Sequence, residues 1–298
     1  MKLIGIQDRR YLSQRYISSL VFSYIEKNKS KNKKPRLIEE PSYGLKRIQR
    51  RMLALLNSIE IPKFVFSGVK GRSYIQNIRY HRNCKYMFAI DISAFFPSIT
   101  RNAVYIFFKD QLKCQPDIAN CLASLTTVAV QNSRYSDFKE IDVFLNAKGV
   151  YNRNHLMTGA PTSSLLSYMV NQNMFNTLHS YAKGHGLKMS IYVDDVYFSS
   201  QKPIPQIVQS EIIKIVSKYN YAVSIKKKRY YGLRDNKEIT GAIINRKGSP
   251  RIKPSWKKRI AELQNQLELT PNNTVVQLEL KGLLLNASQI QPSIKRTN

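Results

Sequence analysis

The stretch IYVDDVYF at residues 191–198 decides the fold of this chain. Two adjacent carboxylates, Asp194 and Asp195, interrupt apolar, β-branched and aromatic residues, a pattern that predicts two strands joined by a hairpin with the acids at its tip. No other acid occurs between Val143 and this pair. Two interpretations remain open from these residues alone: an exposed Asp-Asp turn, or a site for a hard divalent cation, which prefers oxygen ligands.

The composition predicts a polyanionic partner. The 298 residues include 48 Lys and Arg against 19 Asp and Glu, a formal net charge of +29. So large a basic excess favours nucleic acid. An anionic membrane surface is the rival, but no long apolar run or signal peptide is present, so no membrane association is expected. The cysteines, Cys84, Cys114 and Cys121, lack CxxC spacing, which argues against disulfides or zinc and favours the reducing cytoplasm.

Hydrophobic periodicity predicts the order of helices and strands. Strands are expected before the turn at 41–44, at 86–92, on both sides of the Asp-Asp pair, and two or three times within 221–260. An irregular hairpin is expected around Phe144 and Gly149. Helices are expected at 11–26, 45–59, 102–112, 116–130, 165–178, 204–219, 255–269 and 272–288.

Two basic segments are candidates for phosphate contacts. The helix after residue 44 has an apolar stripe and a basic outer face with Arg47 and Arg50, which can follow a phosphate backbone or simply face solvent. Residues 221–260 contain 13 Lys or Arg against two acids, a net of +11.

A third isolated acid connects these observations. Asp91 ends an apolar strand and is the one acid within residues 61–100. Burying it is costly without a partner, which is a metal ion or, more commonly, Lys or Arg. If this strand lies beside the Asp194-Asp195 hairpin, three carboxylates converge and need cations between them. Two Mg²⁺ ions held by carboxylates beside a basic cleft catalyse in-line displacement at phosphorus, so the pattern predicts nucleotidyl transfer.

The ordered motifs resemble the palm of a reverse transcriptase: DISAFF at 91–96, GAPTSS at 159–164 and YVDD at 192–195. Further motifs resemble the NAxxH and VTG elements of bacterial retron reverse transcriptases, namely NIRYH at 77–81 and ITG at 239–241. The family often has Gln and Pro where this chain has Thr158 and Ser164, and many members have a second acid at Ala94.

The resemblance implies an α+β, right-hand polymerase fold with fingers, a palm of antiparallel sheet backed by helices, and a small helical thumb. Residues 1–85 would form an N-terminal helix and the fingers. Residues 86–235 would form the palm, with a fingers insertion at about 101–158. Residues 236–298 would form the thumb and an RNA-binding C-terminal region.

The resemblance also implies roles for individual residues. Asp91, Asp194 and Asp195 would be catalytic and would hold two Mg²⁺ ions, or Mn²⁺ instead, together with the Ile92 backbone carbonyl. Nucleotide-binding residues would be Arg36, Phe96, Gly159, Ala160, Pro161 and Lys227, with Lys34 as a second candidate for the triphosphate. Phe96 is either the steric gate against ribonucleotides or a core residue. RNA-binding residues would be Asn77, His81, Arg47, Arg50, Lys226, Lys228, Arg229, Thr240, Gly241, Arg251 and Lys253, with Tyr230 and Tyr231 stacking on bases. For His81 a structural role is the alternative.

The function implied is that of a retron RNA-directed DNA polymerase in the bacterial cytoplasm. It would use dNTPs to copy its cognate structured non-coding RNA into branched multicopy single-stranded DNA, within an anti-phage defence system that includes an effector protein encoded nearby. A cellular RNase H would remove the template, because the sequence has no second acid cluster. The alternatives are another bacterial defence-associated or group II intron-like reverse transcriptase and a catalytically inactive RNA-binding scaffold.

Overall fold

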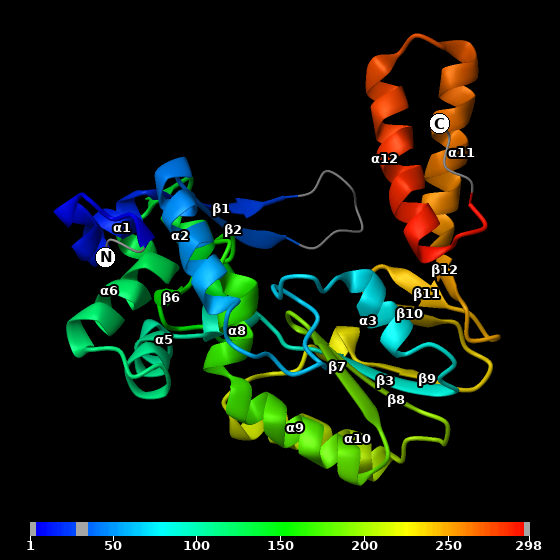
Figure 1. The fold of residues 1–298 in the computed structure, drawn as a ribbon, viewed down its shortest axis with the longest axis horizontal. Coiled ribbons are helices and arrows are strands. Elements are labelled where there is room, and N and C mark those ends of the chain that lie inside the picture. The colour runs from blue at the N-terminus through cyan, green and yellow to red at the C-terminus, as the bar shows by residue number, and fades with distance from the viewer. Residues whose placement is uncertain (1–3, 28–34, 295–298) are drawn as a thin grey trace.

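The computed structural model describes residues 4–27 and 35–294, and it has the expected α+β architecture (Figure 1). Lys34, a candidate for binding the triphosphate, lies outside these residues. At the centre is a four-stranded antiparallel sheet in the order β7-β8-β3-β9. Its strands are β7 (Lys188–Tyr192), β8 (Asp195–Ser200), β3 (Tyr86–Asp91) and β9 (Arg229–Tyr231).

Helices pack against this sheet (Figure 1). Helices α9 (Gln172–Gly184) and α10 (Gln206–Lys218) pack against each other beside β7, each through a buried apolar stripe. Helix α3 (Tyr74–Tyr80) also contacts β7. Because Tyr86–Asp91 is buried at five of its six positions, β3 needs cover on both faces.

The N-terminal part of the chain contains the antiparallel pair β1 (Val21–Glu26) and β2 (Arg36–Pro41), to which β5 (Arg134–Tyr135) adds in parallel. A second pair consists of β4 (Thr127–Ala129) and β6 (Asn154–Leu156). The helices of this part are α1 (Gln14–Ser19), α2 (Tyr43–Leu56), α4 (Phe95–Ser98), α5 (Arg101–Ile106), α6 (Pro116–Thr126), α7 (Phe138–Asn146) and α8 (Ser163–Val170). One apolar core runs through this part and the central sheet.

The C-terminal part begins with the antiparallel sheet β10 (Lys237–Ile239), β11 (Ala242–Ile244) and β12 (Pro250–Ile252). The long helices α11 (Pro254–Leu269) and α12 (Thr274–Ile290) follow and stand away from the rest of the molecule as a hairpin (Figure 1). A separate small core joins Ile239 and Ala287 to Met87 and Tyr197 of the central sheet. The C-terminal part is therefore anchored on strands β3 and β8.

Three local predictions are wrong. The helix expected at 11–26 ends at Ser19, because the β-branched and aromatic residues from Val21 onward alternate in burial and pair with β2. The helix expected at 116–130 ends at Thr126 and continues as β4. The hairpin expected near Phe144 is helix α7, whose N-cap Asp137 accepts a hydrogen bond from the Glu140 N–H.

Two further expected helices are interrupted. The stretch at 102–112 changes after Ile106 into a wider turn at Phe107–Gln111. The helix carrying Leu165 to Leu178 is divided into α8 and α9 at Asn171. None of the helices in the described parts of the chain is long and apolar enough to cross a membrane.

Candidate active site

The hairpin predicted from the Asp-Asp pair is present and lies beside β3. In the antiparallel register of β3 and β8, Asp91 is directly opposite Asp195. The Ile92 N–H donates to the Asp194 carbonyl at 2.9 Å, which extends the pairing into the hairpin tip. Val193 adopts a left-handed backbone with φ 60°, an uncommon conformation for a β-branched residue that makes this turn tight. The three acids therefore meet at one end of the central sheet.

Asp91 has a cationic partner. It is 4% exposed, and its Oδ2 accepts a hydrogen bond from the Lys227 ammonium. The Ser224 N–H donates to the Asp91 carbonyl at 2.8 Å, so the segment that carries Lys227 is fastened to β3. Burial by itself would lower the Lys227 pKa, but the hydrogen bond to Asp91 and the nearby carboxylates raise it, which keeps the ammonium charged.

Asp194 and Asp195 have no cationic side chain bonded to them among the described residues, and their pKa values are raised. Burial, followed by repulsion from Asp195 and Asp91, raises the pKa of Asp194 to about 7. Burial and repulsion from Asp91 raise the pKa of Asp195 to about 6. The site therefore holds more negative charge than its own residues neutralise at neutral pH.

Tyr197 connects this site to the C-terminal sheet. Its hydroxyl donates to Asp195 Oδ2 at 3.2 Å and accepts from the Thr240 N–H at 3.0 Å. Burial and the Asp195 charge raise the pKa of Tyr197, so its hydroxyl keeps its proton and remains a donor. Thr240 has φ 38° in the turn between β10 and β11, and this turn aims its N–H at the tyrosine.

The donor set fits a hard divalent cation. The carboxylates supply oxygen atoms, and their mutual repulsion would be relieved by a cation between them. In residues 4–27 and 35–294, no group of three His, Cys, Asp or Glu side chains forms a ready-made metal cage. Mg²⁺ does not require one, because it usually binds through one or two carboxylates, water and substrate phosphates.

The aromatic pair after Asp91 is divided between two environments. Ala94 has φ 46° and precedes α4, in which Phe95 is 3% exposed and packs edge-on against Phe175 and Tyr221. Phe96 is only half-buried. Phe95 is therefore the core residue, and Phe96 keeps a partly accessible ring.

The predicted nucleotide-binding residues lie on two adjoining segments. Arg36 is exposed at the start of β2. Gly159 is exposed, and a Cβ atom there would lie 2.4 Å from the carbonyl oxygen of Glu39, also on β2. Ala160 is buried and Pro161 is half-buried. The loop before α8 thus lies directly against the strand that carries Arg36.

Two of the residues predicted to bind RNA are in the interior, and for their side chains the prediction is wrong. Asn77 and His81 are both 0% exposed. The His81 ring bonds to the hydroxyls of Ser199 and Ser190, each at 2.7 Å, and so links α3 to β7 and β8. Burial and the nearby Lys188 charge lower the pKa of His81 to about 3, so the ring is neutral. Asn77 has no hydrogen-bond partner for its side chain among the described residues.

The other basic candidates are accessible. Arg47 and Arg50 are exposed on α2, and Lys226, Lys228 and Arg229 are exposed around the segment that carries Lys227. Gly241 is exposed, whereas Thr240, Arg251 and Lys253 are half-buried, and Lys253 pairs with Glu238. Tyr230 is exposed and Tyr231 half-buried.

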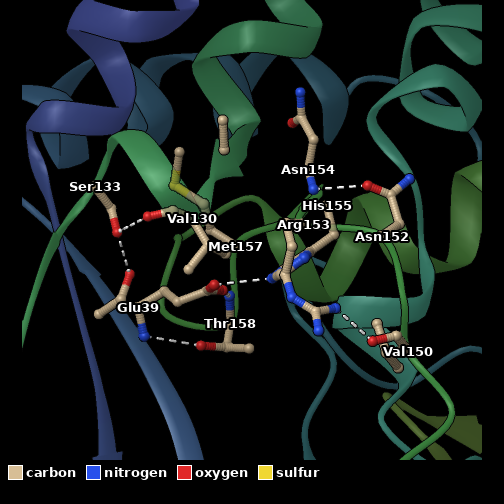
Figure 2. A network of polar contacts seen from close by, with 12 residues as sticks. Glu39, Val130, Ser133, Val150, Asn152, Arg153, Asn154, His155, Met157 and Thr158 are labelled. Atoms are coloured by element: carbon tan, nitrogen blue, oxygen red, sulfur yellow. Dashed lines mark hydrogen bonds and ion pairs between the residues drawn. The ribbon is translucent and has the colours of Figure 1, made fainter. Parts of the chain in front are cut away.

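One polar cluster near the site was not predicted. Glu39 hydrogen-bonds to both His155 and Thr158, just before the Gly159 loop in the sequence (Figure 2). A sequence signal for Glu39 exists, because it shares the inward face of β2 with Leu37. The His155 partner comes from 116 residues further along the chain and leaves no such signal.

Comparisons with known proteins agree with this geometry. The family model described as "Reverse transcriptase (RNA-dependent DNA polymerase)" matches residues 25–244. The chain is 27% identical to the retron Se72 reverse transcriptase of Salmonella heidelberg (strain 579083-10) over 72% of this chain and 50% of that relative. It is 24% identical to the retron Ec86 reverse transcriptase of Escherichia coli over 74% and 62% of the two chains, and 22% identical to the retron Ec83 enzyme of the same species over 87% and 80%. The match thus spans half of the Se72 relative and under two thirds of the Ec86 relative.

Proposed function

Because this chain belongs to the reverse transcriptase (RNA-dependent DNA polymerase) family, we propose that it is an RNA-directed DNA polymerase of the retron type. One observation carries the proposal: Asp91 faces Asp195 across β3 and β8, with Asp194 at the hairpin tip and Lys227 against Asp91. A scaffold that had lost catalysis would have no need for three converging acids, two of which have pKa values raised by burial and by mutual repulsion.

The three acids would bind Mg²⁺, with Mn²⁺ as a substitute and the Ile92 carbonyl as a further ligand. When bound, the metal would lower the pKa of the attacking 3′-hydroxyl and neutralise charge on the leaving pyrophosphate. Lys227 is placed to hydrogen-bond to Asp91 before substrate arrives and then to offer its ammonium to the pyrophosphate.

The nucleotide would lie beside the contact between β2 and the loop before α8. Arg36 would contact the triphosphate from the exposed start of β2. Gly159, Ala160 and Pro161 would line the adjoining wall, which the missing side chain of Gly159 allows to pack against the Glu39 backbone of β2. The accessible ring of Phe96 would stack under the sugar and exclude a 2′-hydroxyl.

The three parts of the structure correspond in this proposal to fingers, palm and thumb. The fingers would be β1, β2 and helices α1, α2 and α5 to α7, and the palm would be the central sheet with α9 and α10. The thumb would be the β10-β11-β12 sheet with the α11–α12 hairpin. RNA would follow the exposed basic residues of α2 and of the segment before β9, namely Arg47, Arg50, Lys226, Lys228 and Arg229.

The similarity to relatives named retron reverse transcriptases leads to the further partners. The template would be a cognate structured non-coding RNA, and the product branched multicopy single-stranded DNA joined to that RNA. A cellular RNase H would remove the copied template. A defence effector protein encoded nearby would act with the complex against phage.

The decisive experiment supplies purified protein with its cognate RNA, Mg²⁺ and dNTPs and measures labelled DNA. The wild-type protein should synthesise DNA, and the double variant Asp194→Asn plus Asp195→Asn should make none. Asp110→Asn is the matched control, since Asp110 is an exposed acid beside Lys109. DNA synthesis by the double variant would refute the metal assignment, and sequencing the nucleic acid that copurifies with the protein would identify template and product.

A further inference from the structure

We propose that Glu39, His155 and Thr158 form a buried clamp that holds the Gly159 loop against β2 and thereby sets the affinity of the polymerase for the incoming dNTP. The inference rests on the proposed function and assigns positioning roles to three residues outside the catalytic acids. Figure 2 shows the cluster, with Glu39 between the His155 ring and Thr158.

The cluster consists of three hydrogen bonds between distant parts of the chain. His155 Nε2 lies 2.8 Å from Glu39 Oε1 and, facing a carboxylate, acts as the donor. The Thr158 N–H donates to Glu39 Oε2 at 2.9 Å, and the Glu39 N–H donates to Thr158 Oγ1 at 2.9 Å. One residue of β2 therefore bonds to both ends of the segment that leads from β6 into the Gly159 loop.

Burial makes these bonds costly to break. Glu39 and His155 are both 0% exposed, so neither can exchange its partner for water. A buried carboxyl group that loses a hydrogen-bond donor is left with an unsatisfied acceptor, which costs free energy. His155 is held from its other side as well, because its backbone pairs with Val128 in the β4–β6 ladder.

The clamp lies directly under the proposed nucleotide site. Gly159 follows Thr158 and touches the Glu39 backbone so closely that an added Cβ would be 2.4 Å from the carbonyl oxygen. Arg36 precedes Glu39 by three residues, about 10 Å along a strand. The same hydrogen bonds thus fix the spacing between the arginine expected to hold the triphosphate and the loop expected to line the base and sugar.

The clamp acts on binding and leaves the reacting groups untouched. Asp91, Asp194, Asp195 and Lys227 take part in none of its hydrogen bonds. Loosening the loop should therefore raise KM for dNTP while kcat stays nearly constant, the pattern expected when ground-state and transition-state binding weaken equally.

The test compares Glu39→Gln with wild type on a primed RNA template. The substitution keeps the shape of the side chain but replaces one carboxylate oxygen, an acceptor, by an NH2 group, a donor. KM for dNTP should rise about tenfold, the effect of weakening one charge-assisted hydrogen bond. Glu40→Gln is the matched control, because Glu40 is the next residue of β2, is exposed and pairs with Lys46. Its kinetics should equal those of wild type.

A second pair of variants covers the case in which Glu39→Gln does not fold. Thr158 is only half-buried, so Thr158→Ala should fold and raise KM by removing the acceptor of the Glu39 N–H. Thr158→Ser keeps the hydroxyl and should restore the wild-type KM. A wild-type KM for dNTP in both Glu39→Gln and Thr158→Ala would overturn the proposal. A fall in kcat as large as the rise in KM would overturn it as well.

Hydrogen exchange separates this inference from the proposed function. In Glu39→Gln the Thr158 amide should exchange at least about tenfold faster than in wild type, because its acceptor is weakened. If wild type makes no DNA, the proposed polymerase function fails, and the exchange rate alone decides whether the clamp exists. Equal exchange in Glu39→Gln and wild type overturns the clamp in either case.

Discussion

Asp91 lies directly opposite Asp195 in the antiparallel register of β3 and β8, although 104 positions separate them in the sequence. Neighbouring strands are less than 5 Å apart in the hydrogen-bonding direction, so the two carboxylates share one end of the sheet. This pairing turns three isolated acids into one site, where burial and then mutual repulsion raise the pKa values of Asp194 and Asp195.

Mg²⁺ should stabilise the folded protein. A cation that binds only the folded site adds stability by mass action, about 2.7 kcal/mol at a concentration 100 times its Kd. We expect the melting temperature of the wild-type protein to rise with Mg²⁺ concentration in a thermal unfolding experiment. The Asp194→Asn plus Asp195→Asn variant should not respond, whereas Asp110→Asn should respond like wild type. A full Mg²⁺ response in the double variant would place the metal elsewhere.

Tyr197→Phe should reduce kcat about tenfold. The change removes the hydroxyl that donates to Asp195 and leaves the Thr240 N–H without an acceptor, which should also lower the free energy of unfolding by about 1–2 kcal/mol. Steady-state kinetics and denaturant unfolding measure the two effects. Tyr230→Phe, at an exposed tyrosine of β9, is the control for loss of a hydroxyl. An unchanged kcat in Tyr197→Phe would show that Asp195 keeps its position without this donor.

His81 should make the protein less stable in mild acid. An unfolded histidine has a pKa of about 6.5, whereas burial lowers that of His81 to about 3. Between these values the unfolded chain binds a proton that the folded chain does not, so the free energy of unfolding falls as pH decreases, by up to about 1.4 kcal/mol per pH unit. Above about pH 6.5 this residue adds no pH dependence.

Denaturant unfolding at several pH values between about 7 and 5 checks this slope. His81→Gln should show a shallower pH dependence than wild type, since the titrating group is gone. The exposed His185 supplies the control, and His185→Gln should keep the wild-type slope. Equal slopes in all three proteins would contradict the role assigned to His81.

Gly159→Ala should weaken nucleotide use. The new methyl group would lie 2.4 Å from the Glu39 carbonyl oxygen, so the loop must move away from β2 and KM for dNTP should rise about tenfold or more. Gly282→Ala is the control, because a Cβ there meets nothing within 4 Å. In the interior of α12 it should raise stability by up to about 1 kcal/mol. A wild-type KM in Gly159→Ala would show that the loop is not held tightly.

The local sequence was sufficient to predict secondary structure where a single hydrophobic period was clear. The strand at Tyr86–Asp91, the Asp-Asp hairpin and the amphipathic helix α2 follow from runs of apolar residues with clear periods. Prediction from the local sequence failed at Val21–Glu26, where a helix was expected. Helical spacing and strand-forming residues conflict there, and pairing with β2 makes the segment a strand. The same applies to α7, where a polar stretch hides an apolar face that includes Ile141 and Leu145.

The chemistry of the site divides in the same way. The identity of the three acids, their strand and hairpin settings and the basic character of the chain are properties of the sequence alone, because they depend on residue type and spacing. That Asp91 meets Asp195, that Lys227 pairs with Asp91 and that His81 is buried were decided by tertiary structure. The clamp of Glu39, His155 and Thr158 belongs to this second group. Register across a sheet and burial depend on contacts between residues more than a hundred positions apart, and no local propensity encodes these contacts.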